Sequence, residues 1–349
     1  MATTDTDTDT DTDTKPWIRG VNIGGWLLLE RFITPYTFAL TTCHLKGDFR
    51  WYPGQIDAPP TSSPLYKPMD AQALKECKPV ATYPVDEWTL TDAFGDDKDL
   101  ARKYLEFHYD NFVTREDIVM LKENGATHVR VPLGHWITGN IADDEPYVDG
   151  GWKYFVRLVG WCREVGIEVW PDIHTAPGSQ NGFDNSGHLL DVDPTCHGWD
   201  MDDKHASDYN STILAASMGL DSDSIPTDGI VLSNNAQRSL TILDEVTSAI
   251  ARDGLTDVVT GFGNLNEPFA NCDIDVIKKF DDLSKAIVRR NMGEDASLYI
   301  GDVFNKTKFN DGFWTDEKDK GTYLDSHYYH VFDERPRHLG PREHIALVW

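Results

Sequence analysis

The first candidate for chemistry is the carboxyl group of Glu267, in the stretch VVTGFGNLNEP at residues 258–268. An apolar, β-branched run leads into Asn266 and Glu267, and Pro268 follows. This order is typical of a buried strand that carries an amide and a carboxylate to its C-terminal end. A carboxyl group placed there is a candidate general acid/base. Because Asn-Glu-Pro also occurs at helix N-termini and in turns, the motif needs support from the rest of the chain.

That support comes from polar residues that follow other strand-like runs: Glu30, Arg130, His174, His327 and Tyr329. In parallel βαβ structures, the residues at the C-terminal ends of the strands lie at one edge of the sheet. Alternation along the last run places His327 and Tyr329 on the same face. We therefore expect these side chains to gather around Glu267.

Short apolar strands alternate with amphipathic helices along the chain, which predicts parallel βαβ units and the α/β class. A doubly wound sheet usually carries a glycine-rich phosphate turn, which the sequence lacks, so a (β/α)8 TIM barrel is favoured. Pro132 is expected to end the second strand. The expected strands cover 17–23, 127–131, 167–173, 258–265, 297–303 and 322–328, and the expected helices 115–124, 152–165, 235–252, 273–290 and 341–349.

The domain organisation follows from these elements. Residues 1–15 form an Asp/Thr-rich tail that we expect to be disordered and that lacks the apolar core of a signal peptide. Residues 16–349 form a partial barrel of about six of the eight βα units, with loop insertions at about 37–86 and 188–233. Such an open barrel exposes two strand edges, so we expect the chain to be unstable or prone to aggregation.

Charge and cysteine content exclude several classes of protein. The net charge of −26 argues against nucleic acid or an anionic membrane surface as a partner and suits a neutral substrate. No apolar run is long enough to span a membrane. The five cysteines include no Cys-x-x-Cys pair, Cys162 is expected as a buried thiol, and the others leave one or two disulfides open. His174, His327 and His330 lack metal-ligand spacing, so we expect neither a metal nor another cofactor.

Five motifs, in this order, carry a family resemblance. They are RGVNIGGWLLLE (19–30), RVPLGHW (130–136), PDIHTAPGSQNGFDNSG (171–187), LNEP (265–268) and HYYHVF (327–332). The chain resembles the exo-β-1,3-glucanase (glucan 1,3-β-glucosidase) branch of glycoside hydrolase family 5. One departure is Thr175, where the family usually has glycine.

The resemblance implies a role for each matched residue in a retaining hydrolysis that uses two carboxyl groups. Glu267 is the implied acid/base, and Asn266 the donor to the sugar 2-hydroxyl. Arg130, His174, His327 and Tyr329 support the carboxylates and hold the sugar. The implied contacts to the glucan are a terminal-glucose pocket and an aromatic clamp, made by Glu30, Asp184 and Asn185 and by Phe183 and Phe332, respectively.

The resemblance also implies a second glutamate, the nucleophile, in a Gly-Glu-Trp-like context on the seventh strand. The sequence stops before that context, so we expect the nucleophile beyond residue 349 and the 349-residue chain to be inactive or nearly so. The protein is expected to act as a monomer on β-glucan oligosaccharides or polysaccharides. The family is usually secreted or wall-associated, but the acidic repeat leaves the compartment open, including a vacuolar store of glucan.

Two other readings stay open. The first is a non-catalytic glucan-binding protein that keeps the pocket without turnover. The second is a β-1,4-endoglucanase or mannanase of the same family. The long polar loop and Phe183 favour a pocket closed at one end over an open cleft, and therefore favour release of glucose from chain ends.

Overall fold

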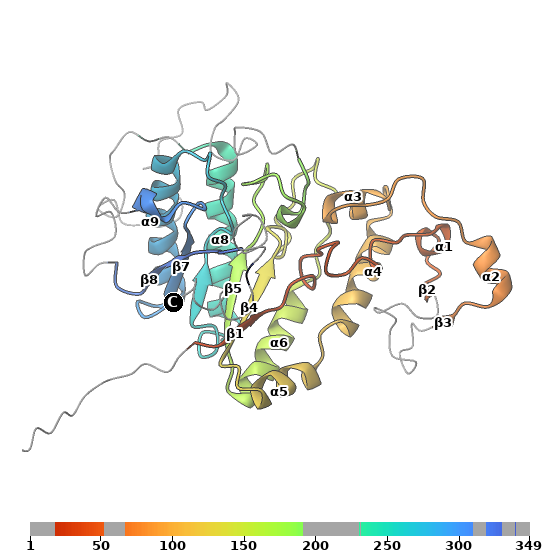
Figure 1. Ribbon diagram of the computed structural model, residues 1–349, viewed down its shortest axis with the longest axis horizontal. Helices are drawn as coiled ribbons and strands as arrows, with labels where there is room; N and C mark the ends of the chain where they lie inside the picture. Colours follow the sequence, from red (N-terminus) through yellow and green to blue (C-terminus); the bar gives the residue numbers. More distant parts are fainter. Residues whose placement is uncertain are drawn as a thin grey trace, which may run out of the picture.

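The fold is organised around a parallel sheet of six strands (Figure 1). The computed structural model describes residues 18–51, 67–190, 230, 232–309, 319–329 and 339. The strands follow one another in the sheet in their order along the chain, as in a barrel that has not closed. The α/β class and the partial barrel are thereby confirmed. The strands are β1 (Gly20–Asn22), β4 (His128–Leu133), β5 (Glu168–Ile173), β6 (Gly261–Gly263), β7 (Ser297–Gly301) and β8 (Thr322–Asp325).

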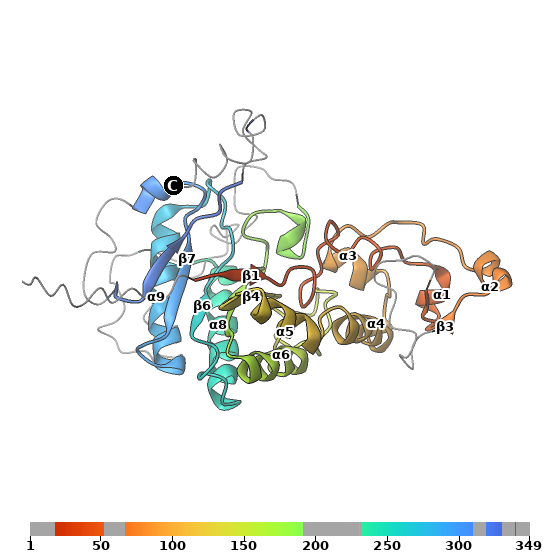
Figure 2. The same ribbon diagram turned by 60° about the horizontal axis from the view of Figure 1, so that its bottom comes forward.

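The helices between these strands pack against the sheet and against each other (Figures 1 and 2). They form where apolar residues recur with helical spacing. Thr114 caps the first of them with a capping box that includes Asp117, and Gly166 ends the second in the left-handed conformation. The helices are α5 (Arg115–Glu123), α6 (Trp152–Val165), α8 (Asn234–Arg252) and α9 (Ile274–Met292).

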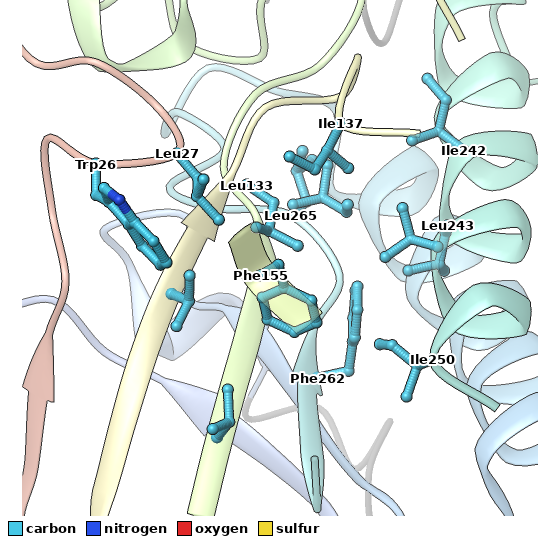
Figure 3. Close-up of a cluster of buried hydrophobic side chains, with 14 of the residues drawn as sticks. Trp26, Leu27, Leu133, Ile137, Phe155, Ile242, Leu243, Ile250, Phe262 and Leu265 are labelled. Atoms are coloured by element: carbon cyan, nitrogen blue, oxygen red, sulfur yellow. The ribbon is translucent and has the colours of Figure 1, made fainter. Parts of the chain in front are cut away.

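The core lies between the sheet and these helices (Figure 3). Leu133 and Phe262 come from the strands, and Leu265 follows β6. They meet Phe155 of α6 and, on α8, the side chains of Ile242, Leu243 and Ile250. All of these side chains are buried. Burial of one large aliphatic or aromatic side chain contributes roughly 1.5–3 kcal/mol, so this contact fixes the helices on the sheet.

Pro132 lies inside β4, whereas the sequence analysis expected it to end the strand. The reason is that the neighbouring strand β1 is short. Ile23 donates its N–H to the carbonyl oxygen of Arg130, so Arg130, and with it Pro132 two residues later, faces β1. Since β1 ends at Asn22, opposite Arg130, the missing N–H of Pro132 removes no ladder hydrogen bond.

The other strands are shorter than expected. The regular ladder covers Gly261–Gly263 in β6 and Thr322–Asp325 in β8, so His327 and Tyr329 follow the last strand instead of ending it. A separate bridge between Val169 and Val259 extends the parallel pairing of β5 and β6. The predicted helix at 341–349, the tail at 1–15 and most of the insertion at 188–233 lie outside the described residues.

The first insertion contains regular structure, although the sequence shows no sustained period there. Its elements lie at one end of the molecule, away from the six-stranded sheet, in both views (Figures 1 and 2). A disulfide joins Cys43 to Cys77, with Cα atoms 5.4 Å apart, while Cys162 is a buried free thiol. The elements are α1 (Thr42–Leu45), β2 (Arg50–Trp51), β3 (Lys67–Pro68) and α2 (Ala71–Glu76), followed by α3 (Glu87–Asp92) and α4 (Lys98–Asn111).

Both edges of the large sheet are open among the described residues. Within this part of the chain β1 pairs only with β4, and β8 only with β7. A concavity of about 840 Å³ lies against this sheet, and among the residues that line it Val21, Tyr323 and Leu324 are 42%, 45% and 40% exposed. No helix in the described ranges is long and apolar enough to cross a membrane.

Candidate active site

The backbone of Glu267 is held in an uncommon conformation at the end of the β6 segment. Its φ angle is 46°, in the left-handed region that non-glycine residues rarely adopt. Asn266 donates its N–H to the carbonyl oxygen of Ile173 at 3.0 Å, and the side chain of Asn181 donates to the carbonyl oxygen of Glu267 at 3.0 Å. Such strain costs about 1–3 kcal/mol and persists where surrounding contacts fix the geometry, often at functional sites.

Gln180 joins the ends of two strands behind Glu267. Its fully buried amide nitrogen donates to the carbonyl oxygens of His174, at 2.9 Å, and Asn266, at 2.8 Å. Its amide oxygen accepts the N–H of Ala176 at 3.0 Å. Every polar atom of this amide group is paired, so one side chain ties the backbone of His174 to the backbone of Asn266.

The carboxylate of Glu267 accepts hydrogen bonds on both oxygens. His327 Nδ1 lies 2.6 Å from Oε1, and the hydroxyl of Tyr329 also donates to Oε1. Asn185 Nδ2 lies 3.5 Å from Oε2. The other ring nitrogen of His327 lies 3.1 Å from a carboxylate oxygen of Asp325. Because both ring nitrogens face carboxylates, the imidazole is protonated on both and donates to both.

The charges of this pair follow from its geometry. Burial raises the pKa of Glu267, but hydrogen bonds from His327 and Tyr329 outweigh it and bring the pKa to about 2. For His327, burial lowers the pKa, and hydrogen bonds to Asp325 and Glu267 raise it to about 9. In this arrangement Glu267 is ionised and His327 is a cation. Glu267 is therefore set up to accept a proton, and it can donate one only after its surroundings change.

Asn266 belongs to a second set of contacts. Its amide oxygen accepts a hydrogen bond from Arg130 at 2.8 Å, which turns its amide nitrogen toward His174 Nε2 at 3.2 Å. His174 Nδ1 lies 2.7 Å from Asp172, and Arg130 lies 3.1 Å from the same carboxylate. Nε2 must therefore accept from Asn266, and Nδ1 donates to Asp172. One hydrogen of the Asn266 amide is used here, and the other remains for a ligand.

Glu30 lies near this set, at the end of the segment that follows β1. The N–H of Gly25 donates to its carboxylate at 3.0 Å, and a Cβ atom on Gly24 would lie 2.8 Å from the same oxygen. A side chain at position 24 would therefore push the Glu30 carboxylate away from this contact. Burial raises the pKa of Glu30, against the lowering effect of the hydrogen bond from Gly25. Burial also raises the pKa of Asp184, which lies close enough for the charge of Arg31 to lower it.

A row of aromatic rings lies beside Glu267. Phe183 meets Phe269 edge to face at 5.5 Å between centroids, and Phe269 meets Phe304 in the same way at 5.9 Å. Phe183 is half-buried, and Phe304 is 37% exposed. Phe332, the other half of the expected clamp, lies outside the described residues.

The structure brings together most of the site residues expected from the sequence. Arg130, Asn266, Glu267 and His327 line one depression at the C-terminal edge of the sheet. Tyr329 and Asn185 contact Glu267 directly, and His174 contacts Asn266. No group of three or more His, Cys, Asp or Glu side chains in the described segments is arranged to hold a metal ion.

Four residues of the site were not predicted: Asp172, Gln180, Asn181 and Asp325. Two of them had a usable signal. Asp172 and His174, like Asp325 and His327, are two residues apart, the spacing that places side chains on one face of an extended segment. Gln180 and Asn181 bond backbone atoms of distant residues, and no sequence pattern indicates such contacts.

Comparison with known proteins confirms the expected resemblance. A protein named glucan 1,3-beta-glucosidase from Pichia angusta is 29% identical over 335 residues, which cover 95% of this chain and 59% of that protein. A probable glucan 1,3-beta-glucosidase A from Aspergillus fumigatus is 31% identical over 90% of this chain and 56% of its own length. The chain thus spans less than two thirds of the curated relatives it matches. No family model matches the sequence.

Solved structures support the fold. The crystal structure of rutinosidase from Aspergillus niger aligns with a TM-score of 0.57 and 18% identity, over 90% of this chain and 70% of that one. The structure named AoRut aligns equally well, with the same TM-score and identity. At this identity the similarity concerns the fold alone.

Proposed function

We propose that this chain, a homologue of the glucan 1,3-beta-glucosidases, belongs to a retaining glycoside hydrolase that releases glucose from the ends of β-1,3-glucan. The observation that carries the proposal is the environment of Glu267 and Asn266. A carboxylate and an amide stand side by side at the C-terminal edge of a parallel sheet, each held by its own set of charged and polar side chains.

The two sets of contacts suit different tasks. Asn266 has one amide hydrogen left after its contact with His174, which suits donation to a sugar hydroxyl without adding negative charge. Glu267 is proposed as the acid/base. In the first step it donates its proton to the leaving oxygen, and in the second step it regains a proton from the attacking water. The nucleophile is proposed to be a glutamate beyond residue 349.

Glu267 must be protonated when the first step begins, although its pKa is about 2 in the described arrangement. A second carboxylate in the same pocket would supply the missing change. Like charges a few ångströms apart cannot both ionise easily, so the pKa of one of them rises. It would also compete for the hydrogen bonds of His327 and Tyr329, which now hold Glu267 as an anion.

The remaining contacts suit recognition of a sugar at one end of a chain. Glu30 and Asp184 offer carboxylates beside the depression, and Asn185 reaches Glu267 from the loop after β5. Phe183, in the same loop, presents an aromatic ring that can stack on the apolar face of a sugar. We propose that Glu30, Asp184 and Asn185 bind the terminal glucose, and that Phe183 and Phe332 contact the next sugar.

Two measurements test the proposal. Calorimetry on the 349-residue chain should detect laminaritriose and give weaker or no binding of cellotriose and mannotriose. Hydrolysis of laminarin by the full-length protein should release glucose first, in the β-configuration by proton NMR. A preference for cellotriose or mannotriose, or early release of longer oligosaccharides, would contradict the exo-β-1,3 assignment. Binding without hydrolysis in the full-length protein would favour the non-catalytic alternative.

A further inference from the structure

A buried chain of polar side chains begins immediately after His174 and leads away from the site. Thr175 is fully buried, and its hydroxyl oxygen lies 2.8 Å from the backbone nitrogen of His135 and 2.9 Å from His135 Nδ1. The other ring nitrogen of His135 lies 3.2 Å from Glu145, whose carboxylate binds Arg238. None of the proposed catalytic steps uses these residues.

The positions of the protons in this chain can be assigned from the partners. His135 Nε2 faces the carboxylate of Glu145, which only accepts, so Nε2 carries a hydrogen. The hydroxyl of Thr175 accepts the backbone N–H of His135, and its own hydrogen points to Nδ1, which accepts it. Burial lowers the pKa of His135, which agrees with a neutral ring. Each group thus has one role, and every hydrogen has an acceptor.

Glu145, at the end of this row of side chains furthest from His174, is held by several contacts. Arg238 of α8 donates to both oxygens of Glu145, each at 2.7 Å, in the bidentate geometry that arginine favours. The same guanidinium donates to the carbonyl oxygen of Asn140 at 2.9 Å and to its side-chain oxygen at 3.1 Å. Ala142 donates its N–H to Glu145 at 2.7 Å. The loop after β4 is therefore tied to α8 through a paired charge.

The near end lies where the sheet stops. The N–H of His174 donates to the carbonyl oxygen of Leu133 at 2.9 Å, the last ladder contact between β4 and β5. Thr175 is one residue beyond His174, and His135 is two residues beyond Leu133. The hydroxyl of Thr175 binds His135 and so extends the contact between the two segments. Thr175 and His135 are thus joined by two hydrogen bonds, one to the backbone N–H and one to the ring of His135.

We propose that Thr175, locked by His135, is a positioning residue that fixes the direction in which His174 meets Asn266. The inference rests on the proposed function, since it assigns a role in the same site. His174 Nε2 lies 3.2 Å from the Asn266 amide, and a shift of the turn after β5 would move this contact. Small displacements of positioning groups lower catalytic rates strongly, by up to about a hundredfold for 1 Å.

The test compares Thr175→Val with Thr175→Ser. Valine keeps the shape and removes the hydroxyl, while serine keeps the hydroxyl. In a protein that also carries the proposed nucleophile, we expect Thr175→Val to lower kcat for laminarin hydrolysis by about tenfold or more, with a smaller change in KM. Thr175→Ser should stay within about threefold of the same protein without the substitution. Loss of thermal stability without any change in kcat would overturn the proposal, as would an equal loss in both variants.

A second measurement does not depend on sugar binding, and its first part uses only the natural chain. Nitrogen-15 NMR of the natural chain should show His135 as the neutral Nε2–H tautomer, and Thr175→Val should change that signal. A protonated Nδ1 in the natural chain would overturn the proposal. If neither laminaritriose binding nor laminarin hydrolysis is found but the Nε2–H tautomer is, the proposed function fails while the lock between Thr175 and His135 stands.

Discussion

Glu87 gives the sharpest stability prediction, because it is a carboxyl group with no exposure to solvent. It is the first residue of α3, and its Oε2 atom accepts the N–H of Leu29 at 2.9 Å. Its Oε1 atom makes no hydrogen bond of ordinary geometry in the described part of the chain. Burial raises the pKa of Glu87 to about 8, against the lowering effects of the N–H of Leu29 and of the side chain of Trp136. Replacing it by glutamine keeps the shape and the acceptor and removes the titration.

The sign and size of the effect follow from the two pKa values. In the folded chain Glu87 keeps its proton up to a pH of about 8, whereas in the unfolded chain it loses it above 4.5. The free energy of unfolding of the natural chain therefore falls as the pH rises from 4.5 to 8, by about 1.4 kcal/mol for each pH unit. Over that range the decrease amounts to at most about 5 kcal/mol. Between pH 5 and pH 7.5 it is about 3 kcal/mol.

Urea unfolding at pH 5 and at pH 7.5 measures this difference directly. We expect Glu87→Gln to gain about 3 kcal/mol relative to the natural chain on going from pH 5 to pH 7.5, because all other groups titrate alike in both proteins. The control is Glu123→Gln, at an exposed glutamate on α5, which should show no such pH-dependent gain. An equal difference in stability at the two pH values would refute the assignment of a neutral buried carboxyl.

Four further predictions concern the site and the sheet. Glu267→Gln in a protein that also carries the proposed nucleophile should lower kcat/KM on laminari-oligosaccharides by about 10²–10⁴-fold, the contribution of the proposed general acid/base, with an unchanged circular dichroism spectrum. His327→Gln removes a cation from Glu267, so the pKa of Glu267 should rise from about 2 toward its usual 4.5, as carboxyl carbon-13 NMR would detect. Gln180→Leu leaves two buried carbonyl oxygens and one N–H without their partner and should lower the free energy of unfolding by about 2–4 kcal/mol in urea titrations. Leu324→Lys places a charge on an open edge strand and should reduce self-association of the 349-residue chain in light scattering; equal association would show that this edge is not responsible.

Much of the site could be predicted because one rule of parallel sheets connects distant parts of the sequence. Arg130, His174 and Glu267 are far apart in the chain, yet His174 and Glu267 lie beyond the C-terminal ends of β5 and β6, and Arg130 lies in β4, three residues before its end. Parallel strands bring all such ends to one edge, so finding the strands was enough to expect the cluster. The helices were equally accessible, because the stripes on α6 and α8 follow the 3.6-residue period.

The contacts that fix the site within that cluster could not be predicted in the same way. Asn181 binds the backbone of Glu267 from a loop, across 86 positions in the sequence. The left-handed conformation of Glu267 is likewise set by its surroundings, since glutamate has no intrinsic preference for it. The course of β4 through Pro132 depended on the length of β1, which propensity does not encode. In each case the deciding partner lies elsewhere in the chain.

The position of His327 between the carboxylates of Glu267 and Asp325 explains why Glu267 is an anion in this arrangement. Its imidazolium donates one hydrogen bond to Glu267 and the other to Asp325, so the cation is fixed between two negative charges. Protonation of Glu267 would weaken its hydrogen bond with His327 and leave the hydrogen bond between His327 and Asp325 intact. The imidazolium of His327 could then bind another carboxylate in place of Glu267. A nucleophile entering this pocket would offer the same hydrogen bonds a new acceptor. Glu267 would then be protonated when His327 and Tyr329 donate their hydrogen bonds to the nucleophile, and ionised when they donate them to Glu267. The strained backbone at Glu267 would hold its carboxyl group in place in both states.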